Sequence, residues 1–274
     1  MTQEKATVST PPILSVGIHG ALGRMGRRLI ELIAQDPAMK LGAAIVSAGN
    51  PNLGQDASVL VGLAPAGVSV CHCLPATAAI DVMIDFSLPG AAVNVAECCK
   101  LRKIPLVVGT TGFTAEERRE LVSASTSIPV LIAPNMSRAV NLLMKLVDTA
   151  SRTLGASADI AIIERHHKTK KDAPSGTALR LAEAAGRGQM SDRLVSAEGG
   201  PANAHPPGEI SVHSLRLADS PGEHVVVFGL MGETLELSHR ALNRDGFVRG
   251  AIDAAKFLAG KPAGLYTIED ALGC

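Results

Sequence analysis

The sequence predicts an α/β protein in which a doubly wound parallel sheet is followed by a second domain. In the first half of the chain, short β-branched runs alternate with stretches of helical periodicity, which is typical of a doubly wound parallel sheet. A glycine-bearing turn joins the first strand to the first helix. After residue 137, three strand-like runs follow one another without helices between them, which favours an antiparallel or mixed sheet.

Each element of the first half is predicted from its own pattern. An apolar run precedes the glycine turn, and Met25, Leu29, Leu32 and Ile33 then recur on one helical face. Thr114 and Glu117 have the spacing of a capping box. The predicted strands are 13–18, 41–46, 68–74, 80–86, 104–108 and 129–133, and further helices are predicted over 91–103 and 114–123.

The second half opens with a long amphipathic pattern and ends with a helix and a short tail. We predict a helix over 139–154, a strand over 159–164, a helix from near Ser175, a loop over 186–207, strands over 209–217, 224–230 and 234–239, a helix over 247–258 and a tail over 265–272.

The amino-acid composition argues against several classes of function. The chain has 26 Lys and Arg against 26 Asp and Glu, so its formal net charge is zero, which argues against binding to nucleic acid or a membrane surface. Five Phe, one Tyr and no Trp are too few for a base-stacking platform. Residues 1–12 lack the apolar segment of a secretory signal, and no apolar run approaches the ~20 residues that span a bilayer. The odd number of cysteines favours reduced thiols, so we expect a cytoplasmic protein.

The turn from Gly20 through Gly23 to Gly26 is a candidate pyrophosphate site. Glycines let the backbone approach a phosphate closely, and the following helix offers free N–H groups. The match is imperfect, because the first glycine of the dinucleotide fingerprint falls on Ile18, and a tight turn without a ligand stays an alternative. Residues 44–47 supply neither the carboxylate that holds a ribose nor an arginine for a 2′-phosphate, so NADH and NADPH both stay open.

Two further segments, 109–113 and 133–137, follow predicted parallel strands. Open α/β sheets bind ligands at the carboxyl ends of their strands, so these segments indicate a cofactor crevice beside the glycine turn. Each taken singly is equally compatible with an ordinary strand-to-helix connection.

The segment 164–177 carries the clearest chemical signal. Four cations and two adjacent histidines lie within 165–171, and Ser175 opens the next helix. A solvated basic face is one interpretation. A site for a small carboxylate substrate is the other, because a helix N-terminus binds anions and a histidine can donate a proton near neutral pH. His19 lies beside the glycine turn with an open role, and the other single histidines are interpreted as structural. No group of residues has metal-ligand spacing, so no metal is expected.

These motifs resemble the 4-hydroxy-tetrahydrodipicolinate reductase (dihydrodipicolinate reductase) family over essentially the whole chain. The resemblance implies a Rossmann-like domain over 1–137, completed by 249–274, and an inserted α+β domain with a mixed sheet over 138–248 that binds substrate and builds a homotetramer. It also implies reduction of (2S,4S)-4-hydroxy-2,3,4,5-tetrahydrodipicolinate, a small dicarboxylate, to tetrahydrodipicolinate with NADPH or NADH, in diaminopimelate and lysine biosynthesis.

The resemblance also assigns roles to residues. His166 falls on the proton donor and Lys170 on a second proton donor, and substrate-binding positions fall on His167, Ser175, Gly176, Thr177 and Thr111. The cofactor-binding positions are Gly20, Ala21, Leu22, Gly23, Arg24, Met25, Gly109, Thr110, Thr111, Ala133, Pro134, Asn135 and Met136. The family's usual acidic and basic pair is replaced by Val46 and Ser47, which leaves the cofactor preference open.

Two alternatives remain at this point. One is a nicotinamide-dependent dehydrogenase for another acid of amino-acid metabolism, because a fold does not fix a substrate. The other is a dinucleotide-binding sensor without catalysis, for which substitution of His166 or Lys170 changes nothing measurable.

Overall fold

The computed structural model describes residues 13–189, 194–196 and 208–273. These residues form two compact units. Unit 1 contains the described residues up to Ala133 together with Ala251–Thr267. Unit 2 contains the described residues of Pro134–Gly250 and those from Ile268 onward. The predicted fold class is confirmed, since a parallel sheet with helices forms one unit and a separate mixed sheet forms the other.

Unit 1 is built on a seven-stranded sheet in the order β12-β6-β5-β4-β1-β2-β3, with every pairing parallel. Its strands are β1 Leu14–His19, β2 Met39–Ile45, β3 Val70–Cys71, β4 Val82–Asp85, β5 Leu106–Val108, β6 Pro129–Ile132 and β12 Gly264–Tyr266. The chain winds away from β1 in both directions, so the carboxyl ends of β1 and β4 flank the point where the strand order reverses. That point is where sheets of this topology bind ligands.

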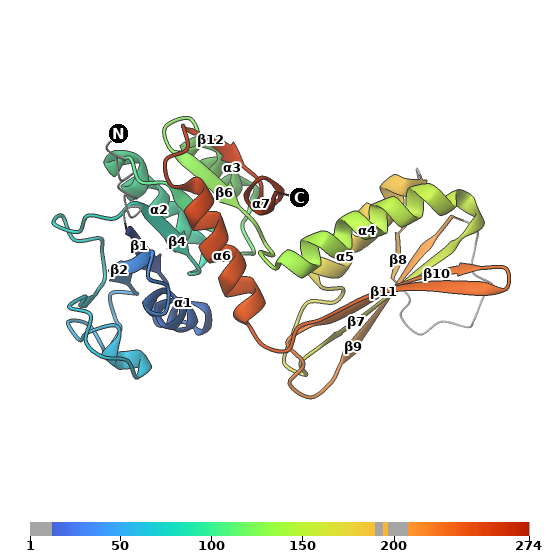
Figure 1. The fold of residues 1–274 in the computed structure, drawn as a ribbon, viewed down its shortest axis with the longest axis horizontal. Helices are drawn as coiled ribbons and strands as arrows, with labels where there is room; N and C mark the ends of the chain where they lie inside the picture. Colours follow the sequence, from blue (N-terminus) through green and yellow to red (C-terminus); the bar gives the residue numbers. More distant parts are fainter. Residues whose placement is uncertain (1–12, 190–193, 197–207, 274) are drawn as a thin grey trace, which may run out of the picture. The chain divides into compact units, whose positions relative to one another are not determined.

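Helices flank this sheet (Figure 1). They are α1 Arg24–Ala34, α2 Pro89–Arg102, α3 Ala115–Ala124 and the second half of α6 Asp245–Leu258, with a short 3₁₀ turn η1 at Val59–Val61. The predicted capping box is present at the start of α3, where Thr114 and Glu117 satisfy each other's backbone N–H groups. One core cluster joins α2, α3 and the strands, and it includes Cys99, Leu106, Leu121 and Val130.

Unit 2 is built on a five-stranded mixed sheet in the order β11-β10-β7-β9-β8. Its strands are β7 Asp159–His166, β8 Leu194–Ser196, β9 Ile210–Arg216, β10 Glu223–Leu230 and β11 Glu233–Arg240. β9 runs parallel to β7 and β8, whereas β10 is antiparallel to both β7 and β11. The remaining elements are α4 Arg138–Leu154, η2 Gly155–Ser157, α5 Gly176–Gln189 and α7 Ile268–Leu272.

The helices α4 and α5 pack on one face of this sheet, and the residues between them form its core (Figure 1). Side chains alternate between the two faces of a strand. On β7, Ile160 and Ile162 are fully buried against the helices, and Glu164 and His166 continue the same inward phase. A carboxylate and an imidazole therefore take positions that the pattern reserves for core residues.

Three predicted elements differ from the structure. The strand predicted over 68–74 pairs only at Val70–Cys71. Within the predicted loop 186–207, α5 continues to Gln189 and β8 forms over Leu194–Ser196, while the other residues from 190 to 207 lie outside the described part. The tail contains β12, which pairs with β6, and α7, which contacts α4. Across the described residues, no helix combines the length and apolar character needed to cross a membrane.

Candidate active site

The glycine turn of unit 1 keeps its path because two glycines tolerate close backbone contact. Gly20 has a φ of +78°, and a Cβ there would lie 2.3 Å from the Phe86 carbonyl oxygen. A Cβ on Gly26 would lie 2.3 Å from the Gly20 carbonyl oxygen. The N–H groups of Gly20 and Ala21 both donate to the Ile45 carbonyl, at 2.9 and 3.0 Å. The turn is therefore fixed between β2 and the segment that follows β4.

The start of α1 has the properties of an anion-binding helix N-terminus. Gly23 is the N-cap residue, no side chain caps the helix there, and no acidic residue lies in the first turn. The Arg27 side chain holds the turn by two hydrogen bonds. Its Nε donates to the Leu22 carbonyl at 3.0 Å, and its Nη1 donates to the Leu60 carbonyl at 2.7 Å. Uncapped N–H groups and the positive end of the helix dipole suit a pyrophosphate.

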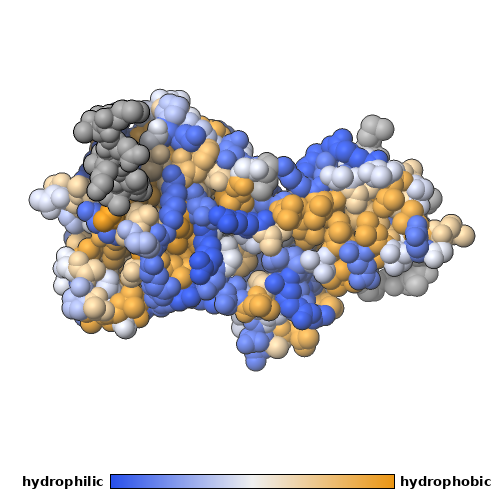
Figure 2. Space-filling view, viewed as in Figure 1, coloured by the Kyte–Doolittle hydropathy of each residue, from blue (hydrophilic) through white to orange (hydrophobic). Residues whose placement is uncertain are grey.

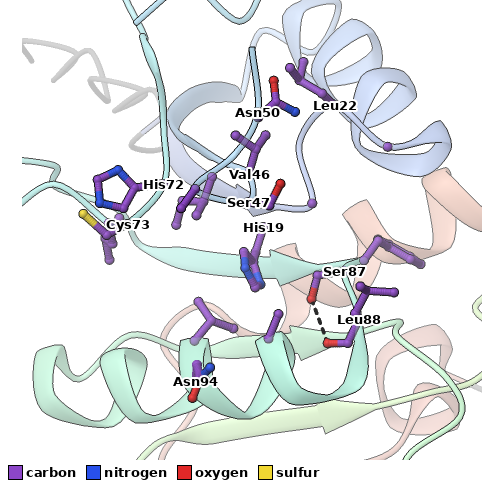
Figure 3. Close-up of a pocket in the computed structure, with 18 of the residues that line it drawn as sticks. His19, Leu22, Val46, Ser47, Asn50, His72, Cys73, Ser87, Leu88 and Asn94 are labelled. Atoms are coloured by element: carbon purple, nitrogen blue, oxygen red, sulfur yellow. Dashed lines mark hydrogen bonds between the residues drawn. The ribbon is translucent and has the colours of Figure 1, made fainter. Parts of the chain in front are cut away.

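A cavity of about 600 Å³ lies beside this turn. Figure 3 shows Val46 and Ser47 on one side of it and Ser87 and Leu88 on another. His72 and Cys73, interpreted from the sequence as structural, also line it. None of the described residues that line this cavity is Lys, Arg, Asp or Glu. A neutral cavity next to this glycine turn fits the nucleoside part of a dinucleotide, so the residues present are compatible with a nicotinamide cofactor.

A buried hydrogen-bond network ties together the strand ends at this crevice. The Asp85 carboxylate is fully buried and accepts from His19 Nδ1 at 2.7 Å and Ser87 Oγ at 2.6 Å on one oxygen, and from Thr110 Oγ1 at 2.6 Å on the other. The Ser87 N–H in turn donates to Thr110 Oγ1 at 2.8 Å. His19, which the sequence left without a role, thus belongs to the network that fixes the ends of β1 and β4 and the segment after β5.

In unit 2, the structure brings two predicted segments together. Asn135 Nδ2 donates to Thr177 Oγ1 at 2.9 Å, and Asn135 Oδ1 accepts the Ser137 N–H at 2.9 Å. Asn135 therefore links the start of α4 to the start of α5. Among the other predicted positions, Ala133 and Met136 are buried, whereas Thr111 and Pro134 are exposed.

His166 lies at the end of β7 in a buried ionic cluster. Its Nδ1 contacts the Glu164 carboxylate, which also accepts from Arg216 Nη1 at 2.9 Å and from the Ser175 N–H at 3.3 Å. Burial alone would raise the pKa of Glu164, but the contacts of its carboxylate with His166, Ser214 and Arg216 outweigh burial and lower that pKa to about 2. The carboxylate is therefore ionised at neutral pH and acts only as an acceptor.

Ser175 connects this cluster to α5. Its hydroxyl oxygen accepts the Ala178 N–H at 3.2 Å, as an N-cap residue does, and it lies 3.2 Å from His224 Nε2. Burial, with the neighbouring His166 as the next cause, lowers the pKa of His224 to about 3, so this ring is neutral. Next in the chain, a Cβ on Gly176 would meet nothing within 4 Å, so open space adjoins the N-terminus of α5.

The other two polar candidates lie in the turn after β7. Lys170 Nζ pairs with the Asp172 carboxylate at 2.7 and 2.8 Å, and this bond lowers the pKa of Asp172. His167 Nδ1 lies 2.8 Å from Thr169 Oγ1. Both side chains are half-buried, as expected of groups at the rim of a small-molecule site.

Glu164, His166 and His224 each offer a ligand atom, and these atoms lie within 4.8 Å of one another, a spacing that could hold a metal ion. No metal was expected from the sequence. The Arg216 guanidinium already compensates the Glu164 charge, and His166 Nδ1 occupies the second carboxylate oxygen. A divalent cation would have to compete with both, so we assign no metal to this cluster.

Sequence reasoning missed the residues that support His166. The sequence assigns Glu164 no role and His224 a structural one, and it does not single out Arg216. They meet because β10 and β9 flank β7, which pairs Glu164 with His224 and His166 with Arg216. One signal was available, since Glu164 is in phase with the apolar Ile160 and Ile162.

Fold and site together define a nucleotide-binding Rossmann-like protein with a second unit that presents a buried histidine centre. The sequence matches the family described as "Dihydrodipicolinate reductase, N-terminus" over residues 14–136 and "Dihydrodipicolinate reductase, C-terminus" over residues 139–272. The chain therefore belongs to the dihydrodipicolinate reductase family.

Similar curated proteins carry the name 4-hydroxy-tetrahydrodipicolinate reductase. One from Anaeromyxobacter sp. (strain Fw109-5) is 45% identical over 266 residues, covering 95% of this chain and 98% of its own. One from Rhodopirellula baltica is 44% identical, covering 97% and 98%.

Among solved structures, a dipicolinate-bound dihydrodipicolinate reductase from Paenisporosarcina sp. TG-14 is similar, with a TM-score of 0.75 and 25% identity over 94% of this chain and 98% of that one. An amine dehydrogenase from Mycobacterium smegmatis, at 12% identity and a TM-score of 0.64 over 96% of each chain, shares the fold alone.

Proposed function

We propose that this protein reduces (2S,4S)-4-hydroxy-2,3,4,5-tetrahydrodipicolinate to tetrahydrodipicolinate with NADH or NADPH, in diaminopimelate and lysine biosynthesis. The reaction consumes one hydride and one proton and releases water. The observation that carries the proposal is the buried His166, held by an ionised carboxylate next to the uncrowded start of α5. Family membership and the names of the relatives support the same reaction.

The cofactor supplies the hydride when bound. Its proposed binding residues are those of the glycine turn, Gly20, Ala21, Leu22, Gly23, Arg24 and Met25, with Gly109, Thr110 and Thr111, and Ala133, Pro134, Asn135 and Met136. Loss of the 4-hydroxyl group as water gives the ring a conjugated C=C and C=N system, and hydride addition to that system leaves negative charge on the substrate. A positioned acid that quenches this charge contributes roughly 10²–10⁴-fold in rate.

In this proposal His166 donates that proton and Lys170 is a second donor. The N-terminus of α5, with Ser175, Gly176 and Thr177, binds a substrate carboxylate through N–H and hydroxyl groups. His167 and Thr111 complete the substrate contacts. Cations and oriented N–H groups suit a dianionic substrate better than an apolar pocket does.

The direct test is turnover by the purified protein with substrate generated by the preceding synthase. NAD(P)H oxidation should depend on that substrate. Activity with a different amino or hydroxy acid instead would favour another dehydrogenase. Cofactor binding without turnover of any acid tested would favour a sensor.

Two variants separate the proposed roles. His166→Gln should lower kcat by roughly 10²–10⁴-fold with little change in cofactor affinity, because it removes the acid alone. Thr177→Val should mainly raise KM, because it removes a hydroxyl at the start of α5. Near-normal kcat in His166→Gln would show that another group donates the proton.

We further propose a homotetramer. A tetramer with two-fold axes needs more than one self-complementary surface, and unit 2 has two surfaces that carry exposed apolar side chains. One covers the outer side of α4 with Leu142 and Leu146, where Figure 2 shows hydrophobic side chains gathered. The other is the sheet face opposite the helices, which includes Ile163 and Leu215. Light scattering should give four times the chain mass, and the monomer mass would refute this part.

We place the enzyme in the cytoplasm, where thiols such as the buried Cys99 stay reduced. Fractionation of cells that produce the protein, followed by immunoblotting, tests this location.

A further inference from the structure

Glu164 is a fully buried carboxylate that the proposed reaction does not itself use. It takes an inward position on β7 where the strand otherwise presents Ile160 and Ile162 to the core. A buried charge costs several kcal/mol unless it is paired and hydrogen-bonded. A buried carboxylate at this position of β7 indicates a role that an apolar side chain could not perform.

The contacts of Glu164 define what it does to its neighbours. One carboxylate oxygen, Oε1, accepts from Arg216 Nη1 at 2.9 Å and from the Ser175 N–H at 3.3 Å, and the other, Oε2, contacts His166 Nδ1. Because an ionised carboxylate only accepts hydrogen bonds, His166 Nδ1 must carry the proton in that contact. The same carboxylate also touches the backbone at the start of α5.

The other ring nitrogen of His166, Nε2, lies next to the backbone of Gly222, which has no side chain. Gly222 has a φ of +146°, and a Cβ there would lie 3.0 Å from His166 Nε2. Because Gly222 has no side chain, no Cβ crowds Nε2 there.

Other titratable groups near His166 come from every neighbouring element. His224 on β10 packs edge-on against it, with ring centroids 5.3 Å apart, and is neutral because its pKa is lowered to about 3. His239 on β11 lies beyond His224, with centroids 6.4 Å apart, and burial lowers its pKa as well. Arg216 on β9 is paired with Glu164, and Lys170 in the following turn is paired with Asp172. Glu164 is therefore the anion in direct contact with the His166 ring.

We propose that Glu164 is a positioning residue for the reduction: its carboxylate holds the Nδ1 proton of His166, so that Nε2 is the nitrogen that exchanges a proton with the substrate. This inference rests on the proposed function, in which His166 is the acid. It adds that the tautomer, the ring orientation and the charge of that acid all depend on a residue that does not touch the substrate.

Glu164→Gln tests the idea most sharply. The amide oxygen can still accept from Arg216 and Ser175, while the amide NH₂ faces His166 and donates to Nδ1. The proton then moves to Nε2 of a neutral ring, which is a poor acid. We expect kcat to fall by roughly 10²–10⁴-fold, as when an orienting carboxylate is replaced by an amide in a serine-protease triad, with KM nearly unchanged.

The pH profile separates positioning from mere structural support. Glu164→Gln removes the negative charge that contacts the His166 ring, so the pH dependence of kcat in this variant should differ from that of the wild type. Glu223→Gln is the matched control: Glu223 also pairs with arginines, at 3.0 Å to Arg165 and 3.3 Å to Arg240, but lies on the other face of the sheet. It should keep the wild-type kcat and profile. Wild-type kcat and profile in Glu164→Gln would overturn the proposal.

Should Glu164→Gln fold poorly, the double variant Glu164→Gln/Arg216→Gln removes both charges of the buried pair and should show the same loss of kcat. Wild-type kcat in the double variant would contradict the proposal.

A second measurement reads the ring protonation in the unaltered chain and uses a variant only to assign the signals. Nitrogen spectra of ¹⁵N-histidine-labelled wild-type protein, with the His166 signals assigned by their loss in His166→Gln, should show that the neutral His166 ring carries its proton on Nδ1. A neutral His166 protonated on Nε2 would overturn the proposal. This result stands whether or not the wild-type enzyme reduces the proposed substrate, so failure of the function and failure of the positioning role are distinguishable.

Discussion

Replacing Gly20 by alanine should weaken cofactor binding, and the size of the loss in affinity can be worked out from the structure. A non-glycine residue in the left-handed region costs about 1–2 kcal/mol, and Gly20 has a φ of +78°. The added Cβ would also lie 2.3 Å from the Phe86 carbonyl oxygen and 2.8 Å from its carbon, both backbone atoms that cannot rotate away. Overpacking of this kind costs about 1–3 kcal/mol.

Together these costs come to about 2–5 kcal/mol, so if the turn must keep its shape to bind cofactor, Kd should rise at least ~30-fold. Calorimetric titration of wild-type and Gly20→Ala protein with NADH measures this directly. Gly260→Ala is the control, because Gly260 has a φ of +80° but no atom within 4 Å of its Cβ position. If Gly20→Ala binds NADH as tightly as the wild type, the turn is not the pyrophosphate site.

Three further predictions concern the network, pH and the cofactor. Asp85→Ala leaves the hydrogen-bond donors of His19, Ser87 and Thr110 without their shared acceptor, which should lower the free energy of unfolding by about 2–5 kcal/mol; an unchanged denaturation midpoint would count against the network. The folded pKa of His224, about 3, lies below its ordinary 6.5, so the unfolded chain takes up the proton first. The stability that the neutral His224 contributes is complete above pH 6.5 and is lost as the pH falls toward 3. In His224→Gln the denaturation midpoint should therefore depend less on pH over that range than in the wild type. NADH and NADPH should give similar kcat/KM, because the cavity residues are uncharged; a strong preference for either would mean that a charged group reaches the ribose.

The fold was largely predictable because its signals are local. Strand and helix periodicity identified the parallel sheet, and strands in succession identified the mixed one. The extra strand β8 at Leu194–Ser196 was missed because a short strand within a Gly- and Pro-rich stretch has no periodicity of its own and forms by pairing with β9. Tertiary pairing, not local pattern, decides such elements.

The candidate site was predictable only as far as its motif extends along the chain. His166, Ser175 and Thr177 lie within one continuous segment. The partners that give His166 its properties come from strands distant in sequence, and only the register of β9 and β10 against β7 brings Arg216 and His224 to it. The Asp85 network was missed for the same reason, since Asp85 and Thr110 follow different strands.

The central claim is that the chain transfers hydride from a nicotinamide cofactor to the proposed dicarboxylate. The most direct measurement uses NADH deuterated on the transferred position of the nicotinamide, substrate generated by the synthase, and mass spectrometry of the product. Tetrahydrodipicolinate carrying one deuterium per NADH oxidised is the result we predict. Unlabelled product, or NADH oxidation that does not depend on the substrate, would contradict it.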